Sequence, residues 1–273
     1  MLAEWFRHLT TPCPAPFKRM GYLKELIAMD ARHWRCHDAW STHLRECHDL
    51  IGKATENIRH RKVTVLGSGP LLDIPIEELA ATFEEVALVD IVHLPTVEKH
   101  VRAFSNIELI SADVAGIAEA VWEHVEEGRT GPLPVSLAVS TANTAPYLDS
   151  DLVISANLLT QLPLIPLGLV REKAPVYSDD EIKAFARNII DNHLALLAVL
   201  PGRVCLLSET ERVIWGGPNG DEVIEEIDPL FGARIPASGR KWTWDIAPRP
   251  EINRHIDLRF RMTGIADLKN AGG

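Results

Sequence analysis

Short apolar segments alternate with helical patterns from residue 63 to residue 208, and this alternation constrains the fold more than any other feature of the sequence. Each segment is continuously apolar, which is typical of strands that are buried on both faces. Repeated strand-helix-strand units with right-handed crossovers place helices on both faces of a parallel sheet. We therefore predict an α/β fold with a doubly wound, mostly parallel sheet. The predicted strands are 63–67 (VTVLG), 86–90 (VALVD), 107–111 (IELIS), 152–156 (LVISA) and 204–208 (VCLLS).

The segments between and after these strands complete the predicted domain. Helical patterns occupy 75–83, 95–104, 114–127 and 179–200, and the last of these begins with Ser178 and Glu181 at the spacing of a capping box. Residues 128–150 are rich in Gly, Pro, Ser and Thr and predict an extended insertion. A Gly-Pro-Asn-Gly hairpin turn and two later segments predict antiparallel strands that close a seven-stranded sheet. These later segments are 242–248 (WTWDIAP) and 255–265 (HIDLRFRMTGI).

The N-terminal region has a helical pattern without the alternating strands that follow it. We therefore divide the chain into a helical cap, 1–60, and a Rossmann-like domain, 61–273. Residues 21–59 contain no proline and have apolar residues at helical spacing, which predicts one long or two shorter helices. Tetrahedral zinc needs about four ligands, and one helix rarely presents more than two. We therefore predict no metal site, and we expect Trp34 or Trp40 to pack onto the domain as a lid over the pocket. The polar and aromatic side chains that share one face here are His33, Cys36, His37, Trp40, His43 and Cys47.

The composition argues against two classes of partner. Lysine and arginine total 28 against 38 aspartate and glutamate residues, which gives a formal net charge of −10. Binding to the backbone of DNA or RNA depends on an excess of basic residues, so we expect no nucleic-acid partner. The apolar stretch 194–200 falls far short of the roughly 20 residues needed to cross a bilayer, so we expect no membrane span.

The N-terminal segment and the cysteines indicate a cytoplasmic protein. The segment 1–16 carries Glu4 and lacks the apolar run of a signal peptide. The four cysteines include no CxxC pair and are too few for a disulfide scaffold, so we expect reduced thiols. The sequence leaves the oligomeric state open.

A glycine-containing turn follows the first predicted strand. Gly67, Ser68 and Gly69 come directly after the strand, and glycines at this point let the backbone bend tightly and let a ligand approach. A helix that starts just after such a turn presents free N–H groups to the ligand. Asp90 ends the second predicted strand about 20 residues later, where one carboxylate accepts hydrogen bonds from both hydroxyls of a ribose.

Two further elements belong to the same edge of the predicted sheet. Asp113 and Val114 follow the third strand, where a polar side chain reaches an adenine amine. The segment 151–163 (DLVISANLLTQLP) contains the fourth strand and the loop after it. Ligands of open α/β sheets bind outside the carboxyl ends of the strands. The sequence therefore predicts a nucleotide-like ligand at this edge.

On these residues the chain resembles the class I S-adenosylmethionine-dependent methyltransferase family, over roughly residues 60–210. The resemblance implies S-adenosylmethionine as the cofactor and methyl transfer as the activity. It also implies that the glycine turn wraps the methionine part, that the second-strand acid binds the ribose, and that the residues after the third strand meet adenine. The residues that the resemblance assigns to the cofactor are Gly67, Ser68, Gly69, Asp90, Asp113 and Val114.

The first motif is degenerate at two positions. The family usually carries an acid two residues before the first glycine, where this chain has Val65, and Leu71 replaces its third glycine. The methionine end would then be held differently, with Asp73 as one candidate. Two alternatives follow, namely a non-catalytic methyltransferase-like protein with a binding or regulatory role, and an NAD(P)-binding oxidoreductase. The nicotinamide fingerprint would require a last glycine where this chain has Leu72.

Methyl transfer from a sulfonium depends more on alignment than on a general base, so few polar residues are needed. Asn157 and Gln161 lie one turn apart if the loop opens a helix, and we predict them as the catalytic, substrate-side residues. The alternative is that they only cap that helix. The loop lacks an Asn-Pro-Pro-aromatic signature, which favours a small-molecule acceptor over a nucleic acid or protein amine. His93 either contacts the ribose or adenine or is an exposed loop histidine.

Overall fold

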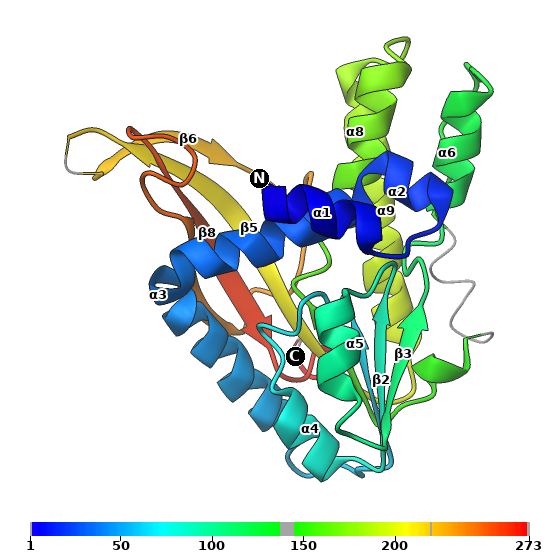
Figure 1. Ribbon diagram of the computed structural model, residues 1–273, viewed down its shortest axis with the longest axis vertical. Coiled ribbons are helices and arrows are strands. Elements are labelled where there is room, and N and C mark those ends of the chain that lie inside the picture. The colour runs from blue at the N-terminus through cyan, green and yellow to red at the C-terminus, as the bar shows by residue number, and fades with distance from the viewer. Residues whose placement is uncertain (1, 137–144, 219, 272–273) are drawn as a thin grey trace.

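The five apolar segments form adjacent parallel strands of one sheet, as the sequence predicts. The computed structural model describes residues 2–136, 145–218 and 220–271 (Figure 1). The strands are β1 (Lys62–Leu66), β2 (Glu85–Asp90), β3 (Ile107–Ser111), β4 (Leu152–Ala156), β5 (Arg203–Gly216), β6 (Glu222–Ile227), β7 (Arg240–Ala247) and β8 (Asp257–Ile265). β1, β2, β4 and the first half of β5 are mostly buried because helices cover them on each side, whereas the edge strand β3 has no buried residue, so the expectation of burial on both faces is wrong for β3.

The strand order is β3-β2-β1-β4-β5-β8-β7, and β6 pairs with β5 off this path. The chain order reverses between β1 and β4, and this switch point is where open α/β sheets bind ligands. β7 and β8 are antiparallel, as predicted. We call β6, β7, β8 and the second half of β5 the antiparallel wing, which extends to one side of the parallel strands in Figure 1.

The prediction of seven strands is wrong by one. β5 runs for 14 residues, and its second half pairs with β6 across the predicted glycine-rich turn. Half of the β6 sequence, EVIEEI, is glutamate, and the first five residues of the strand are exposed. It therefore lacks the apolar signature that identifies the other strands.

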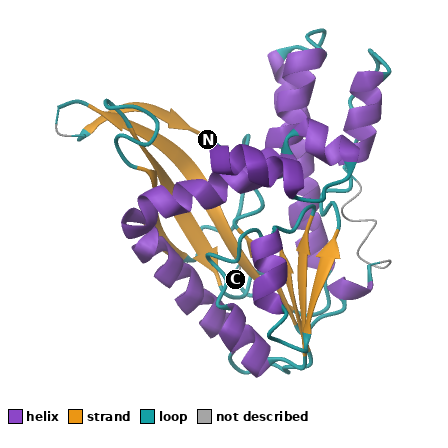
Figure 2. Cartoon of the chain, in the orientation of Figure 1, coloured by secondary structure: helices purple, strands orange, loops and turns teal. Residues whose placement is uncertain are grey.

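Helices cover the sheet near the predicted positions (Figure 2). The capping box is confirmed, since the Ser178 hydroxyl accepts from the Glu181 N–H while the Glu181 carboxylate accepts from the Ser178 N–H. Of the predicted insertion 128–150, residues 137–144 lie outside the described part. None of the described helices has the length and apolar character that crossing a bilayer requires. The helices are α1 (Leu2–Thr10), α2 (Ala15–Met20), α3 (Tyr22–Thr55), α4 (Ile76–Thr82), α5 (Pro95–Val101), α6 (Ala118–Glu126), the 3₁₀ helix η1 (Pro146–Leu148), α8 (Leu164–Lys173) and α9 (Asp179–Val199).

The long helix α3 packs directly on the sheet. Its second half contributes Leu50 and Ile51 to the same apolar core as Val65 of β1 and Ile154 of β4. The helix also joins the core between the sheet and α4 and α5, whereas α9 covers the opposite face. The division of the chain at residue 60 stays a prediction, but the burial of α3 explains why its apolar residues follow a helical period.

The two tryptophans of α3 have opposite environments. Trp40 is 1% exposed, and its ring lies 4.8 Å from that of Trp244 on β7. Trp34 is 77% exposed. The expectation that one of them packs onto the domain is therefore confirmed for Trp40. The residue packs on the antiparallel wing, however, and does not line the cavity described below.

Candidate functional site

The predicted site residues meet at the carboxyl ends of the parallel strands. Gly67 and Gly69 follow β1, Asp90 ends β2, Asp113 follows β3, and Asn157 follows β4. Because the switch point lies between β1 and β4, the glycine turn and Asn157 flank it directly. The structure therefore brings together residues that are separated by up to 90 positions in the chain.

The turn after β1 depends on left-handed backbone conformations. Gly67 has φ +78° and Gly69 has φ +49°, in the region that favours glycine. A Cβ atom on Gly67 would lie 2.8 Å from the Cβ of Leu158, so the close approach of the β4 loop also requires glycine there. Leu71, which stands in place of a third glycine, has φ +65°. The backbone thus keeps a glycine-like conformation at this position even though the residue has changed.

Ser68 and Asp90 complete the turn. The Ser68 side chain is fully buried, and its hydroxyl has no hydrogen-bond partner among the described residues. The Asp90 carboxylate accepts from the Gly69 N–H at 2.8 Å and from the Ile91 N–H at 2.7 Å. Burial raises the pKa of Asp90 above its usual value, while these two hydrogen bonds oppose the shift. The acid therefore orders the turn, and its contact with a ribose stays a prediction.

Asp113 has a structural role that the sequence did not reveal. Its carboxylate accepts from the backbone N–H groups of Ala115, Ile117 and Ala118, at 3.0, 2.7 and 2.7 Å. These hydrogen bonds satisfy free donors at the start of α6. Val114 is 8% exposed and packs in the core on the α9 side of the sheet. The predicted contact of these two residues with adenine stays a prediction.

The loop after β4 does not open a helix at Asn157. Asn157 has φ +49°, residues 159–163 form turns, and α8 begins only at Leu164. The Gln161 amide donates to the Asn157 carbonyl at 2.8 Å and so holds the turn in place. The conditional expectation of two side chains on one helix face is therefore wrong, because the left-handed Asn157 ends the regular backbone. Their assignment to the substrate side stays a prediction.

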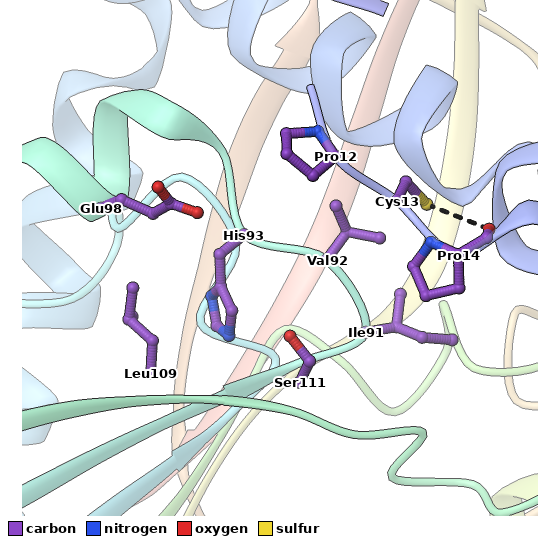
Figure 3. A pocket seen from close by; sticks show the side chains of 9 residues that line it. All are labelled: Pro12, Cys13, Pro14, Ile91, Val92, His93, Glu98, Leu109 and Ser111. Atoms are coloured by element: carbon purple, nitrogen blue, oxygen red, sulfur yellow. Dashed lines mark hydrogen bonds between the residues drawn. The ribbon is translucent and has the colours of Figure 1, made fainter. Parts of the chain in front are cut away.

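A cavity of about 580 Å³ lies beside the carboxyl ends of β2 and β3. Figure 3 shows its lining from three parts of the chain, namely the connection between α1 and α2, the loop from β2 into α5, and β3. Ile91 and Leu109 provide apolar surface, and His93 and Ser111 provide polar atoms. The sequence predicts a ligand at the β2 end of this cavity but not the N-terminal residues that cover it. The lining residues are Pro12, Cys13, Pro14, Ile91, Val92, His93, Glu98, Leu109 and Ser111.

His93 is buried and not an exposed loop residue. It is 8% exposed, and its Nε2 lies 3.1 Å from the Ile110 carbonyl. Because a carbonyl accepts hydrogen bonds, Nε2 carries the proton and Nδ1 is an acceptor. Nδ1 has no partner in the described part of the chain. The ring therefore offers a free acceptor to a ligand that brings a donor into the cavity.

Tyr22, the first residue of α3, lies near two of the predicted cofactor acids, which the sequence does not predict. Burial and the nearby carboxylates of Asp113 and Asp90 raise the pKa of its hydroxyl. The hydroxyl thus stays protonated at neutral pH and lies in the electrostatic field of both predicted cofactor acids. An isolated tyrosine at a helix start has no sequence signature that would link it to strand ends more than 60 residues away.

A buried polar cluster lies where α3 passes the switch point. His43 and Cys47 come from successive turns of α3 and Asp73 from the loop after β1, and their ligand atoms lie within 4.8 Å of one another. The Cys47 Sγ is 3.6 Å from the His43 Nε2 and 3.9 Å from the Asn157 Nδ2. The Asn157 Nδ2 also donates to the Asp73 Oδ2 at 2.5 Å. We call His43, Cys47, Asp73 and Asn157 the switch-point cluster.

The hydrogen bonds of this cluster do not fit a metal ion. The Trp242 indole N–H donates to the His43 Nδ1 at 3.0 Å, so the proton of the neutral ring is on Nε2, the nitrogen nearest Cys47. A metal-bound histidine instead donates its second N–H to an acceptor. Burial lowers the pKa of His43 to about 3 and raises that of the Cys47 thiol well above its usual value. Both side chains are therefore neutral hydrogen-bonding groups.

Comparisons with known proteins give a fold likeness at low identity. The sequence matches no protein-family model and no curated protein. Burkholderia thailandensis 1,6-didemethyltoxoflavin-N1-methyltransferase, solved with S-adenosylhomocysteine, is 13% identical with a TM-score of 0.41, over 93% of this chain and 92% of that chain. The N-methyltransferase NodS from Bradyrhizobium japonicum WM9 is 12% identical with a TM-score of 0.36, over 84% and 90%. A S-adenosylmethionine-dependent methyltransferase from Leishmania major is 11% identical with a TM-score of 0.35, over 96% and 82%.

Proposed function

We propose that this protein binds S-adenosylmethionine along the carboxyl edge of its sheet and transfers the methyl group to a small-molecule acceptor. The observation that carries the proposal is the order of elements along that edge. The cavity at β2 and β3, Asp90 on β2, the glycine turn after β1 and Asn157 after β4 follow one another in the order of the strands. Neighbouring strands are about 4.8 Å apart, so the edge from β3 to β4 spans about 14 Å. This length suits an extended nucleoside joined to an amino acid.

The cavity suits the adenine part of such a ligand. Its volume lies within the range of roughly 300–1,000 Å³ that is usual for small-molecule sites. Ile91 and Leu109 offer apolar contacts to a flat ring, and the free Nδ1 of His93 accepts from the exocyclic amine of adenine. The neighbouring Asp90 carboxylate is then in the direction of the ribose hydroxyls. A phenol at Tyr22 adds a further donor between this acid and Asp113.

The contribution of the protein to catalysis is mainly alignment. The cofactor, when bound, supplies a methyl group that its sulfonium already activates. Holding the acceptor in line with that methyl group can supply most of the rate, because it removes the entropic cost of a bimolecular encounter. The ligand-binding groups named above fix the nucleoside, and the β4 loop from Asn157 to Gln161 borders the place where the acceptor would lie.

Isothermal titration calorimetry with three compounds tests the proposal. We expect S-adenosylmethionine and S-adenosylhomocysteine to bind and NAD to give no heat. Binding of NAD alone would favour the oxidoreductase alternative. Absence of heat with all three compounds would overturn the proposal. Binding without turnover of any methyl acceptor would support the non-catalytic alternative.

The variant Asp90→Asn tests the ribose assignment. It keeps the size of the side chain but removes the charge, so we expect binding of S-adenosylhomocysteine to weaken about 10- to 100-fold, the usual value of a hydrogen bond to a charged group. Asp191→Asn is a matched control, because Asp191 forms an exposed ion pair with Arg187 on α9. Unchanged affinity in Asp90→Asn would show that the carboxylate serves only to order the glycine turn.

A further inference from the structure

A second cavity, of about 320 Å³, lies at the end of the antiparallel wing. Its lining comes from the turn between β5 and β6 and from the loop between β7 and β8, at the end of β5 that is farthest from the parallel strands (Figure 1). Every titratable residue of the described lining is basic, although the whole chain carries a net charge of −10. We call this the wing-tip cavity, and it is lined by Gly217, Pro218, Arg249, Arg254 and His255.

The wing-tip cavity is separate from the proposed cofactor site. The Asn157 N–H donates to the Leu207 carbonyl at 3.0 Å, which places Leu207 of β5 level with the carboxyl edge of the sheet. Gly217 comes ten residues later, directly after the end of β5. At about 3.3 Å per residue of strand, the two sites are up to about 33 Å apart. A ligand in the wing-tip cavity therefore does not overlap with a nucleoside at the carboxyl edge.

Arg249 is held in the cavity wall by the protein itself. Its Nη1 donates to the Gly217 carbonyl at 3.1 Å, and its Nε pairs with the Asp257 carboxylate at 3.2 Å. The guanidinium also lies against Gly220, where a Cβ atom would come within 2.1 Å of Nη2. Nη2 has no hydrogen-bond partner among the residues that the structure describes. The arginine thus presents a free donor in a fixed position, so little side-chain entropy is lost when a ligand binds.

Two acids of the neighbouring loop are engaged by other arginines. Asp257 is 6% exposed and is shared between Arg249 and Arg259. Glu251 pairs with Arg35 of α3 at 2.6 Å, and the hydrogen bond from Arg35 holds the pKa of Glu251 below its usual value. Neither carboxylate is therefore available to neutralise the other basic residues of the cavity.

Arg254 and His255 are those remaining basic residues. Both are exposed, and neither side chain has an ion pair or hydrogen bond to another residue in the described part of the chain. Their backbone is ordered by Asn253, whose Oδ1 accepts from the N–H groups of His255 and Ile256 at 2.8 and 3.2 Å. The cavity therefore combines two guanidinium groups and an imidazole with unused N–H donors.

We propose that the wing-tip cavity binds a phosphate group, either as the free ion or on a small phosphorylated molecule. The lining contains no aromatic or large aliphatic side chain, so an apolar ligand would find little to contact. Guanidinium groups match the oxygens of phosphate and of carboxylate equally well. A tetrahedral phosphate offers more acceptor oxygens than a planar carboxylate, and it can accept from Arg249, Arg254 and His255 together. The inference stands independently of the proposed function.

Calorimetry with inorganic phosphate at constant ionic strength tests the site. We expect Arg254→Gln to weaken phosphate binding about tenfold or more, the usual value of a hydrogen bond between charged groups. Arg171→Gln on α8 is the matched control, because Arg171 is also exposed and has no ion pair with another described residue. Constant ionic strength matters because salt screens exposed charges. No heat with the wild type, or equal losses in the two variants, would overturn the proposal.

Glu222 provides a test in which the expected change has the opposite sign. This acid is exposed and lies against Gly217, since a Cβ atom there would be 2.8 Å from the Glu222 carboxyl carbon. Its charge repels an anion in the cavity, so Glu222→Gln should strengthen phosphate binding about threefold. Both Glu222→Gln and Arg254→Gln change exposed side chains, so we expect their melting temperatures to stay within about 2 °C of the wild type. Weaker phosphate binding in Glu222→Gln would overturn the electrostatic basis of the proposal.

Two further titrations identify the chemistry of the anion. Acetate carries a planar carboxylate, and we expect it to bind at least about tenfold more weakly than phosphate. Equal affinities for acetate and phosphate would overturn the phosphate assignment. Glycerol phosphate distinguishes the two sources of the group. Tighter binding of the ester than of inorganic phosphate would support a small phosphorylated molecule, and tighter binding of inorganic phosphate would support the free ion.

Discussion

The two ends of the carboxyl edge differ in how they could recognise a ligand. At β2 and β3 there is a cavity with mostly apolar walls, to which His93, Glu98 and Ser111 add polar atoms, and the Nδ1 of His93 has no partner among the described residues. At β1 and β4 there is instead a buried cluster of polar groups around Asp73 and Asn157. Most of the lining at the first end is apolar, and apolar contacts have no preferred direction. The second end is mainly polar and contains the carboxyl group of Asp73, whose pKa burial raises.

The two ends also differ in what supports them. The cavity end is covered by a short connection between α1 and α2, whereas the switch-point cluster is embedded between α3 and the antiparallel wing. The His43 ring stacks on the Trp244 ring at 3.8 Å and an interplanar angle of 3°. Substitutions at the cluster end should therefore affect stability as well as affinity, and substitutions at the cavity end should affect affinity alone.

The largest expected effect is on stability, in Trp244→Ala. Trp244 is 5% exposed and contacts Trp40, His43 and Phe260, so removing the indole should lower the free energy of unfolding by about 3–5 kcal/mol. Urea denaturation measures the change. Trp34→Ala is the control, and because Trp34 is 77% exposed we expect a change within about 0.5 kcal/mol. Equal losses in the two variants would contradict the view that the wing supports the cluster.

A smaller effect is expected in the pH dependence of affinity. If Asp73 holds the methionine end of the proposed cofactor, only its ionised carboxylate attracts the ammonium group there, and burial raises the pKa of that carboxyl. As the pH falls through that pKa, S-adenosylhomocysteine should lose up to about tenfold in affinity relative to 5′-methylthioadenosine, a nucleoside that lacks the amino-acid part. Both nucleosides carry the ribose that the proposal places at Asp90. The ratio of their affinities therefore does not depend on the ionisation of Asp90. His43 and Cys47 stay neutral throughout, so among the groups that face Asp73 only His48 needs a control.

The ratio of the two affinities at several pH values, measured by calorimetry, decides this prediction. Asp73→Asn should make the ratio independent of pH, and His48→Gln should preserve the dependence. A pH dependence that survives in Asp73→Asn would assign the titration to another group.

The smallest effect is expected at the cavity end. His93→Leu removes the free acceptor but keeps apolar bulk, so both nucleosides should bind about 2- to 10-fold more weakly, the usual value of one neutral hydrogen bond. The ratio of their affinities should not change, because His93 lines the cavity at β2 and β3 and Asp73 does not. His100→Leu on α5 is the control, since His100 is exposed and does not line the cavity. A loss confined to S-adenosylhomocysteine would contradict the placement of adenine at this end.

The parallel sheet could be predicted because its signal is local. Each buried strand is a continuous apolar run, and the turn after β1 and the acid at the end of β2 are adjacent to such runs. The same reasoning failed for β6, since an exposed antiparallel strand has no continuous apolar face. It failed for the loop after β4 as well, because the left-handed Asn157 gives no signal in the sequence.

The site could be predicted only in part. The sequence placed Gly67, Asp90 and Asn157 at one edge because the ends of parallel strands must meet there. It identified His43 and Cys47 as neighbours on a helix and Asp73 as a residue of the turn, but it had no means to bring these elements together. Contacts between them depend on how α3 lies across the sheet, and the sequence carries no local pattern for that direction.

Local patterning determined the alternating strands and helices, the capping box of α9 and the edge at which polar residues gather, because these depend on periods of a few residues. The tertiary structure decided which residues face one another there. The approach of Tyr22 to Asp90 and Asp113, the cover of the cavity by Pro12–Pro14, and the pairing of Asp73 with Asn157 join segments far apart in the chain. The physical reason is that the packing of apolar faces brings these segments together. Apolar contacts have no preferred direction, so the pattern of one segment does not show which other segment it will meet in the assembled core.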